Sequence, residues 1–210
     1  NICGNITNVS DTYYFNVSQF TNYSVGDIVD CGDTINSSTT LIRNMTCSGT
    51  GIIIGADDVV LDCDGYTINY STSGTNSTYG INNTGGYDNV TVQNCDIVEG
   101  NITGSYKSAI YFTGAENGTI TNNNITTNGE YGYGIRLNSS SKNNEITNND
   151  IRTNGRTGYG MYLYSSSNNN TITNNNITTT GSDGYGMVLS SSSNNNTITN
   201  RDITTTGSGG

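Results

Sequence analysis

The most constraining feature of this chain is a repeat with a period of 26 residues. Three segments superimpose without a gap: NGTITNNNITTNGEYGYGIRLNSSSK (117–142), NNEITNNDIRTNGRTGYGMYLYSSSN (143–168) and NNTITNNNITTTGSDGYGMVLSSSSN (169–194). A partial fourth copy occupies residues 195–210. A fixed period of about 20–50 residues is typical of one supersecondary unit stacked on copies of itself. The repeat therefore predicts a solenoid. It favours an elongated protein over one that is built around a binding pocket.

Apolar residues recur at fixed places in each copy, and polar residues separate them. The aligned sets are Ile120, Ile146, Ile172 and Ile198; Ile125, Ile151, Ile177 and Ile203; and Leu137, Leu163 and Leu189. This period of two is typical of a strand with one buried face, whereas no window shows helical spacing. Asn and Gly clusters between the apolar residues indicate turns. One copy is therefore predicted to form two or three strands in one coil of an all-β parallel β-helix.

The first half of the chain follows the pattern less regularly. The segments VVLDCDGYTI (59–68) and VTVQNCDIV (90–98) carry the same strand and turn, so we expect the β-helix to cover residues 51–210. Residues 1–50 do not fit the repeat and are predicted to form an N-terminal cap over the open edge of the first coil. A length of 210 residues favours one continuous solenoid over two globular domains.

Identical side chains are expected to stack, because each strand pairs with its copy about 4.8 Å away in the next coil. A ladder of asparagines can satisfy its own amide groups in this arrangement. The predicted structural ladder stands two residues after an inward Val or Ile in each coil and comprises Asn94, Asn122, Asn148, Asn174 and Asn200. None of these residues begins an N-x-S/T sequon.

Composition excludes several classes of partner. A net charge of −10 with only seven Lys and Arg residues disfavours nucleic acids and anionic membranes. No apolar run approaches the roughly 18 residues of a membrane span. The chain has no His and no CxxC motif, which disfavours a zinc site. We expect no cofactor, apart from covalent N-linked glycans.

Five cysteines lie in the first half of the chain. Cys63 and Cys95 occupy nearly matching positions of adjacent coils, which permits a bridge because disulfides need a Cα separation of about 5.5 Å. Cys31 and Cys47 are then expected to pair within the cap, which leaves Cys3 over. The alternative is that some of these cysteines are buried thiols.

Sequons are unusually dense. They begin at Asn5, Asn8, Asn16, Asn22, Asn36, Asn44, Asn69, Asn76, Asn82, Asn89, Asn101, Asn117, Asn124, Asn138, Asn169, Asn176 and Asn195. Up to residue 89, 10 of 12 asparagines start a sequon, whereas an Asn- and Thr-rich composition explains the C-terminal half fairly well. We interpret the excess as dense N-glycosylation, which requires a secreted, surface-exposed chain.

At one repeat position sequons alternate with aspartates along the chain: Asn124, Asp150, Asn176 and Asp202. Coils about 4.8 Å apart are too close for a glycan on every coil of one face, and skipping a coil gives about 9.6 Å. Glycans are therefore predicted on Asn124 and Asn176, pointing to the same side. The alternative is that the alternation of Asn and Asp at these four positions arose by neutral drift.

Two groups of residues are candidates for chemistry. The acidic cluster Asp57, Asp58, Asp62 and Asp64 could supply the paired carboxylates of glycoside hydrolysis, or half of a calcium loop. Aspartate beside glycine is, however, typical of turns, and no His exists for acid–base work. The aligned Tyr133, Tyr159 and Tyr185 could stack on sugars or pack coil on coil. We predict no catalytic residue and no metal ligand.

The segments CSGTGIIIGADDVVLDCDGYTI (47–68), NVTVQNCDI (89–97) and the NNTITNNNIT coils resemble right-handed parallel β-helix proteins with NosD-like, PbH1-type repeats. Such proteins are abundant on archaeal surfaces. The family includes sugar hydrolases, binding modules and scaffolds, so the resemblance implies the fold and extracellular placement. GADD (55–58) resembles the Asp pair of the polygalacturonase branch, but that branch's Gly-His-Gly and Arg-Ile-Lys motifs are missing here.

These features together predict a non-enzymatic, glycosylated extracellular structural protein, a subunit of a surface filament or layer. The alternative is a carbohydrate-binding or polysaccharide-degrading β-helix protein. The last copy stops before its GYGM-type strand, so either the chain continues with more coils or another subunit completes the column. We expect head-to-tail self-association. The predicted junction is non-covalent, between residues 195–210 of one subunit and the N-terminal cap of the next.

Overall fold

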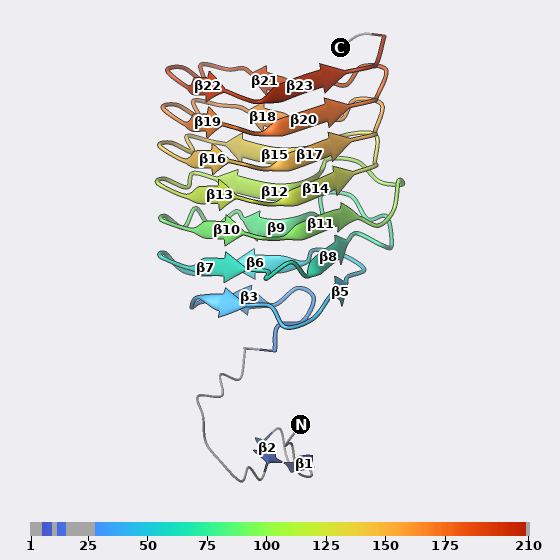
Figure 1. The fold of residues 1–210 in the computed structure, drawn as a ribbon, viewed down its shortest axis with the longest axis vertical. Helices are drawn as coiled ribbons and strands as arrows, with labels where there is room; N and C mark the ends of the chain where they lie inside the picture. The colour runs from blue at the N-terminus through green and yellow to red at the C-terminus, as the bar shows by residue number, and fades with distance from the viewer. Residues whose placement is uncertain (1–5, 10–11, 16–27, 209–210) are drawn as a thin grey trace.

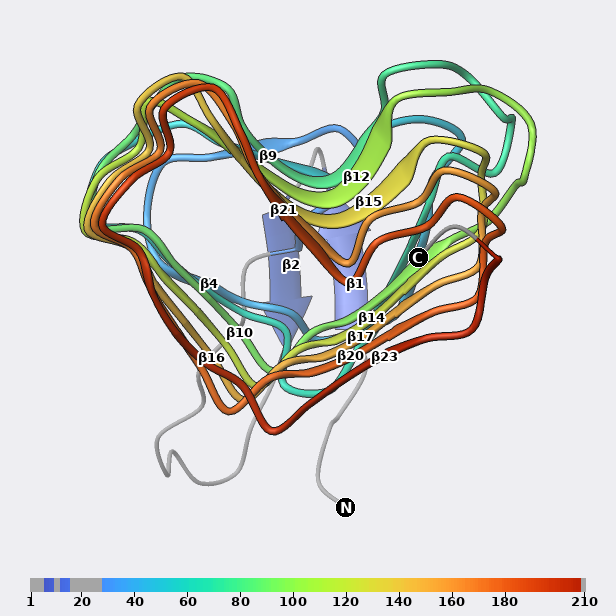
Figure 2. The same cartoon turned by 90° about the horizontal axis from the view of Figure 1, so that it is seen from above.

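The computed structural model describes residues 6–9, 12–15 and 28–208. From residue 28 onward the chain winds into a stack of coils, and each coil gives one strand to each of three parallel sheets (Figures 1 and 2). The described residues include no helix that is long and apolar enough to cross a membrane. The predicted fold class, an all-β parallel solenoid, is confirmed, with three strands in each coil.

Each of the three sheets has seven strands. The first sheet contains β3 (Thr34–Ile35), β6 (Ile52–Ile54), β9 (Tyr79–Asn83), β12 (Lys107–Thr113), β15 (Gly132–Asn138), β18 (Met161–Leu163) and β21 (Met187–Leu189). The second contains β4 (Thr39–Thr40), β7 (Val60–Asp62), β10 (Thr91–Gln93), β13 (Thr119–Thr121), β16 (Glu145–Thr147), β19 (Thr171–Thr173) and β22 (Thr197–Thr199). The third contains β5 (Met45–Thr46), β8 (Thr67–Tyr70), β11 (Asp96–Glu99), β14 (Asn124–Thr127), β17 (Asp150–Thr153), β20 (Asn176–Thr179) and β23 (Asp202–Thr205).

The core is a narrow column of aliphatic side chains inside the coils. Pairing in register places Ile120 beside Ile146 and Ile146 beside Ile172, and all three are fully buried. The predicted columns of aligned apolar residues are therefore confirmed. Ile198 continues the first column but is 40% exposed, because no coil packs on the far side of β22 within the described residues.

The second glycine of each GYG motif is required by the close approach of neighbouring coils. A Cβ atom at Gly134 would lie 2.5 Å from the carbonyl oxygen of Gly160 and 2.5 Å from Cγ2 of Ile151. Any side chain here would push the next coil away, so only glycine fits. The preceding tyrosine, Tyr133, packs outside the aliphatic core.

The β-helix begins before the predicted boundary at residue 51. The strands β3, β4 and β5 pair in parallel with β6, β7 and β8, so much of the segment 28–50 forms the first coil and is not a separate cap. Its strands have only two residues each, which is why the repeat is hard to recognise there. Upstream, β1 (Ile6–Val9) and β2 (Thr12–Phe15) form an antiparallel pair. A cap before residue 28 stays a prediction, and Cys3 lies outside the described residues.

Both predicted disulfides form. Cys31 and Cys47 join two parts of the first coil, with a Cα separation of 5.3 Å. Cys63 and Cys95 join the turns of two adjacent coils, with a Cα separation of 4.7 Å. Each bridge restricts the unfolded chain and typically stabilises a fold by about 2–4 kcal/mol.

The predicted asparagine ladder is wrong by one residue in most coils. Asn122, Asn148 and Asn174 are exposed, with left-handed backbone at φ values of 56°, 57° and 57°. Asn94 is partly buried and has φ of 55°. Asparagine tolerates this conformation, and it turns the chain from the second sheet into the third. The turn interrupts the in–out alternation, so the residue after it is the one that points inward.

The buried ladder runs through Asn123, Asn149 and Asn175 and ends on Asn200, the one predicted member that takes part. The Oδ1 atom of Asn149 accepts hydrogen bonds from the backbone N–H (3.0 Å) and the Nδ2–H (2.9 Å) of Asn123. Asn175 does the same for Asn149, and Asn200 for Asn175. The other Nδ2 proton of Asn123, Asn149 and Asn175 is donated to a backbone carbonyl, that of Ile120 in the case of Asn149.

A second ladder lies at the corner between the first and second sheets and follows the same rule. Asn144, Asn170 and Asn196 each follow an asparagine with positive φ, namely Asn143, Asn169 and Asn195. The Oδ1 atom of Asn170 accepts from the backbone N–H (2.9 Å) and Nδ2–H (3.0 Å) of Asn144, and Asn196 repeats this for Asn170. Two amide ladders therefore connect the coils along the solenoid axis.

We expect Asn149→Ala to lower the free energy of unfolding by about 1–3 kcal/mol, because it leaves buried groups of Asn123 without acceptors. Asn148→Gly is the matched control, since glycine adopts the positive φ of this exposed position without strain. Denaturant unfolding of both variants measures the difference. Equal stabilities of the two variants would contradict the assignment of the ladder to Asn149.

Candidate functional site on the outer face of the first sheet

Two groups of packed tyrosine rings, joined by Arg136, cover part of the outer face of the first sheet. We call this set the tyrosine strip; its members are Tyr79, Tyr111, Tyr133, Tyr159, Tyr162, Tyr164 and Tyr185. Neighbouring rings have centroids 4.9–5.5 Å apart. Seen along the solenoid axis, the backbone outline is drawn inward at this sheet, between two lobes formed by turns (Figure 2).

The strip exists because the coils stack in register. Tyr111 pairs with Arg136, and Arg136 with Tyr162, in three successive coils. Beside them, the ring centroids of Tyr133 and Tyr159 are 5.4 Å apart, and those of Tyr159 and Tyr185 are 5.5 Å apart. The structure thus brings the predicted row Tyr133, Tyr159 and Tyr185 into coil-on-coil contact. Tyrosines from other positions also belong to the strip, namely Tyr79, Tyr111, Tyr162 and Tyr164. Alignment of the copies does not identify them, because they do not recur in every copy.

Arg136 lies within the strip and joins its two halves. The guanidinium carbon is 4.9 Å from the ring centroid of Tyr111, 5.6 Å from that of Tyr133 and 5.7 Å from that of Tyr162. Aromatic faces attract cations at these distances. The Nε atom is buried without a hydrogen-bond partner among the described residues, so the rings, and not acceptor groups, hold the guanidinium in place.

The charge of Arg136 has no carboxylate partner in the described part of the chain. The four ion pairs found there are Arg43–Asp30, Lys107–Glu99, Lys142–Glu116 and Arg156–Asp183. Arg136 is partly buried, whereas the similarly unpaired Arg152 and Arg201 are exposed. A cation that is partly desolvated and unpaired interacts more strongly with an added anion than an exposed one does.

Three phenols of the strip, those of Tyr79, Tyr133 and Tyr159, have a raised pKa and stay protonated at neutral pH. Burial raises the pKa of Tyr133 to about 12, against a smaller lowering by the charge of Arg136. Burial also raises the pKa of Tyr79 and of Tyr159. The strip therefore offers apolar ring faces, hydroxyl groups and one guanidinium, a combination suited to binding.

The acidic cluster lies in the second coil and is used for contacts with the third coil. Asp57 accepts a hydrogen bond from the backbone of Asp88 (2.8 Å), and Asp58 accepts one from Asn89 Nδ2 (2.9 Å). Asp64 has a positive φ of 48°, as expected of a turn residue. No group of three or more potential metal ligands of the His, Cys, Asp and Glu types occurs within the described residues.

Asp62 shows the same use of a carboxylate. Partial burial raises its pKa, but hydrogen bonds from Asn94, from the backbone of Asp64 and from Gln93 outweigh burial and hold the pKa below its usual value. The Nε2 atom of Gln93 and the Nδ2 atom of Asn94 lie 2.8 and 3.0 Å from its two oxygens. An aspartate held ionised by fixed donors is a poor general acid.

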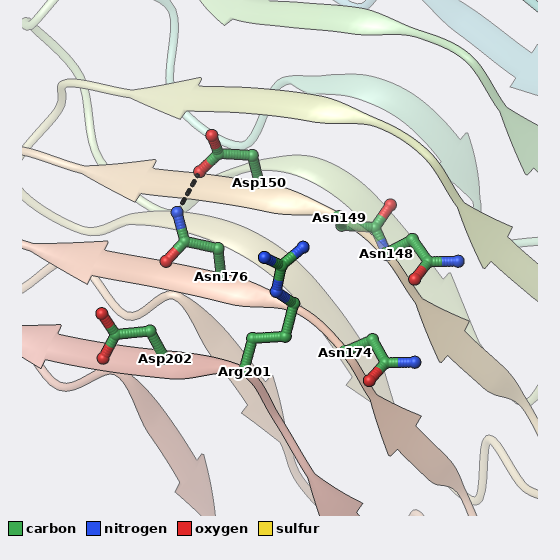
Figure 3. Close-up of a pocket in the computed structure, with 7 residues that line it drawn as sticks. All are labelled: Asn148, Asn149, Asp150, Asn174, Asn176, Arg201 and Asp202. Carbon is green, nitrogen blue, oxygen red and sulfur yellow. Dashed lines mark hydrogen bonds between the residues drawn. The ribbon is translucent and has the colours of Figure 1, made fainter.

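A polar pocket lies at the corner between the second and third sheets (Figure 3). We call it the corner pocket; it is lined by Asn148, Asn149, Asp150, Asn174, Asn176, Arg201 and Asp202. The Nδ2 atom of Asn176 donates a 3.2 Å hydrogen bond to Asp150, and Arg201 extends between Asn176 and Asn149. The pocket therefore surrounds one of the two sequons that the alternation singled out.

The sequon asparagines whose burial is described lie on the outside of the coils. None of the 13 whose burial is described is buried: Asn36, Asn44, Asn69, Asn76, Asn82, Asn89, Asn101, Asn117, Asn124, Asn138, Asn169, Asn176 and Asn195. Asn5, Asn16 and Asn22 lie outside the described residues, and of Asn8 only the backbone is described. The buried asparagines are Asn83, Asn123, Asn144, Asn149, Asn170 and Asn175, and none of these begins a sequon.

Sequence reasoning missed a buried ion pair between Lys107 and Glu99. The Nζ and Oε1 atoms are 2.7 Å apart, and both side chains are at most 1% exposed. The Nζ atom also donates to the carbonyl of Asn101 (2.7 Å), while Oε2 of Glu99 accepts from the backbone N–H groups of Asn128 and Gly129 (2.8 and 2.9 Å). The missed signal is the alternation in DIVE (96–99), which places Glu99 on the same inward face as Ile97.

One family of known proteins matches the chain. The family described as a right handed beta helix region matches residues 16–203, a range that includes the tyrosine strip and the corner pocket. No curated protein and no solved structure matches the chain. Because one fold supports many functions, the match supports the architecture, and the function must be argued from the sites.

Removing one partner of the buried ion pair should be costly, since it leaves an uncompensated charge inside the protein. We expect Lys107→Met to lower the free energy of unfolding by about 3–5 kcal/mol. The double variant Glu99→Gln/Lys107→Met should recover much of that loss, because no charge is then buried. Denaturant unfolding of the single and double variants tests this, and a double variant less stable than the single one would refute it.

Proposed function

The chain belongs to the right-handed β-helix family, and from this premise we propose that it is a non-enzymatic, N-glycosylated extracellular structural protein. The observation that carries the proposal is the separation of its asparagines into two sets. The asparagines of the two ladders are buried or, at Asn196 and Asn200, partly buried, and none of them begins a sequon, whereas no sequon asparagine whose burial is described is buried. Glycans can therefore be attached at many sites without disturbing the ladders.

The environment implied by the cysteines agrees with this proposal. The two disulfides indicate an oxidising compartment, because such bridges are rare where thiols are kept reduced. Dense sequons also acquire glycans only on a secreted chain. The resemblance to NosD-like surface proteins of archaeal type points the same way. We place the protein on the cell surface.

The corner between the second and third sheets suits spaced glycans. Pairing in register forms an outward column of Asp96, Asn124, Asp150, Asn176 and Asp202. The Nδ2 atom of Asn124 donates to Asp96 (2.8 Å), as that of Asn176 does to Asp150 (3.2 Å). An N-linked sugar replaces one amide proton and leaves the other for this bond, so the aspartates can orient the glycosylated amides.

The ends of the described solenoid suit stacking of copies. Leu189, Ile198 and Ile203 of the last coil are 38–45% exposed, although their counterparts one coil earlier are buried. The Nδ2 atom of Asn200, the last member of its ladder, has no hydrogen-bond partner among the described residues. At the other end Ile28 is 53% exposed and lines a pocket with Val29 and Ile35. We propose that these two ends meet in a head-to-tail assembly.

A second candidate function is carbohydrate binding, and one observation favours it. The tyrosine strip presents ring faces and an unpaired guanidinium from successive coils. Aromatic faces and charged hydrogen-bond donors are the groups that recognise sugars with acidic substituents. This function does not exclude the structural one, because the strip and the corner pocket lie on different sides of the coil.

Intact-glycopeptide mass spectrometry of the protein from its native source tests the glycosylation. We expect sugars on Asn124 and Asn176, because both are exposed and about 9.6 Å apart along one column. The neighbouring Asn123 and Asn175 are buried and lie outside sequons, so they serve as internal controls that should be unmodified. Unmodified side chains at both Asn124 and Asn176 would refute the proposal at this corner.

Light scattering over a wide range of concentrations tests the assembly. We expect the average mass to grow with concentration, and Ile198→Asp/Ile203→Asp to abolish that growth by placing charges on the apolar end. The control Thr199→Asp/Thr204→Asp adds the same charge at neighbouring positions of β22 and β23, outside the aliphatic columns and outside every sequon. A wild-type protein that stays monomeric throughout, with no fibres in micrographs, would contradict head-to-tail assembly.

A further inference from the structure

We propose that the tyrosine strip is a binding site for an acidic saccharide, and that its occupant is the glycan attached to Asn82. The inference rests on the N-glycosylation proposed above and goes beyond it by assigning one glycan a binding site on the protein surface. It arises from the position of a sequon at one end of the strip and of an unpaired cation in its middle.

Asn82 shares an outward column with the centre of the strip. Pairing in register places Asn82 beside Tyr111, Tyr111 beside Arg136, and Arg136 beside Tyr162. At about 4.8 Å for each coil, Arg136 lies about 9.6 Å and Tyr162 about 14.4 Å from Asn82 along the axis. A short glycan that starts at Asn82 and follows the column therefore passes over both residues.

The side chain of Asn82 is prepared for attachment. Its Oδ1 atom accepts a 3.0 Å hydrogen bond from the backbone N–H of Thr84, which orients the amide. Its Nδ2 atom, to which a sugar would be linked, donates no hydrogen bond to another described residue. Asn138, the sequon two residues after Arg136, is less accessible for attachment, because its Oδ1 atom is buried.

The chemistry of the strip selects the class of sugar. The negative faces of the tyrosine rings favour the weakly positive C–H groups of a sugar ring. Arg136 adds a guanidinium that has no carboxylate partner in the described structure, and such a group binds carboxylate or sulfate through paired hydrogen bonds. A neutral glycan would leave this charge unused. The glycan of Asn82 is therefore expected to carry a uronic acid or a sulfated sugar near its second or third unit.

A separate acidic polysaccharide would make the same contacts. We assign the tyrosine strip to the protein's own glycan because its linkage to Asn82 holds it beside the strip. The linked glycan therefore has a high effective concentration and outcompetes a free polysaccharide. A free polysaccharide would have to displace it. The two sources can be told apart, because only the first depends on the sequon at Asn82.

Hydroxyl-radical footprinting of the native glycoprotein, read by mass spectrometry, tests the inference at Tyr162, which is partly exposed. Thr84→Ala removes the sequon of Asn82 and keeps Asn82 itself, and it should raise the oxidation of Tyr162 several-fold. The matched control Thr178→Ala removes the sequon of Asn176 on the third sheet and should leave Tyr162 unchanged. Arg136→Gln should also raise the oxidation of Tyr162, whereas Arg152→Gln on the third sheet should not.

The possible results separate this inference from the proposed function. Two results would overturn this inference and leave the proposed function intact. One is that Asn82 carries no sugar while other sequons are glycosylated. The other is that Tyr162 is oxidised equally in Thr84→Ala and in a wild type that is glycosylated at Asn82. A chain bare at every sequon would overturn the proposed glycosylation as well. Added oligogalacturonate could also lower the oxidation of Tyr162. If it does so equally in the glycosylated wild type and in Thr84→Ala, the glycan of Asn82 does not cover the strip, and the site is assigned to a separate polysaccharide.

Discussion

The rest of the structure depends on one constraint, the parallel stacking of coils about 4.8 Å apart. An inward polar group that recurs in every copy of the repeat meets its own copy at that spacing, so it must be a group that can bond to a copy of itself. Asparagine satisfies this condition because its amide both donates and accepts, and Asn123, Asn149 and Asn175 use these groups fully. The same spacing lines up the isoleucine columns inside the coils and the tyrosine rings outside them.

Much of this architecture could be predicted from the repeat. Period two and the aligned isoleucines indicate the strands, and Cys63 and Cys95 were paired correctly from their matching positions. The ladder was predicted one residue early because alternation does not reveal that Asn148 and its counterparts have positive φ, which changes the side on which the next residue points. The boundary at residue 51 was wrong because the two-residue strands β3, β4 and β5 leave almost no pattern.

The groups most relevant to function were harder to predict, because they depend on contacts between coils. Arg136 stands alone at a repeat position where its counterparts are Tyr111 and Tyr162, so its cation–π contacts become visible only once the register is known. Lys107 and Glu99 come from different sheets and meet at a corner that no periodicity describes. In each case the residue type indicates an unusual position, but the partner depends on how the coils pack against each other.

The inner asparagines hold the coils together, and we propose that the outer ones carry sugars. The most direct measurement is a high-resolution cryo-electron microscopy map of the protein isolated from its native source. The account predicts sugar density on outward sequons, including one glycan that runs from Asn82 over Arg136, and unmodified, hydrogen-bonded amides at Asn123, Asn149 and Asn175. A map with bare outer faces at every sequon would contradict it.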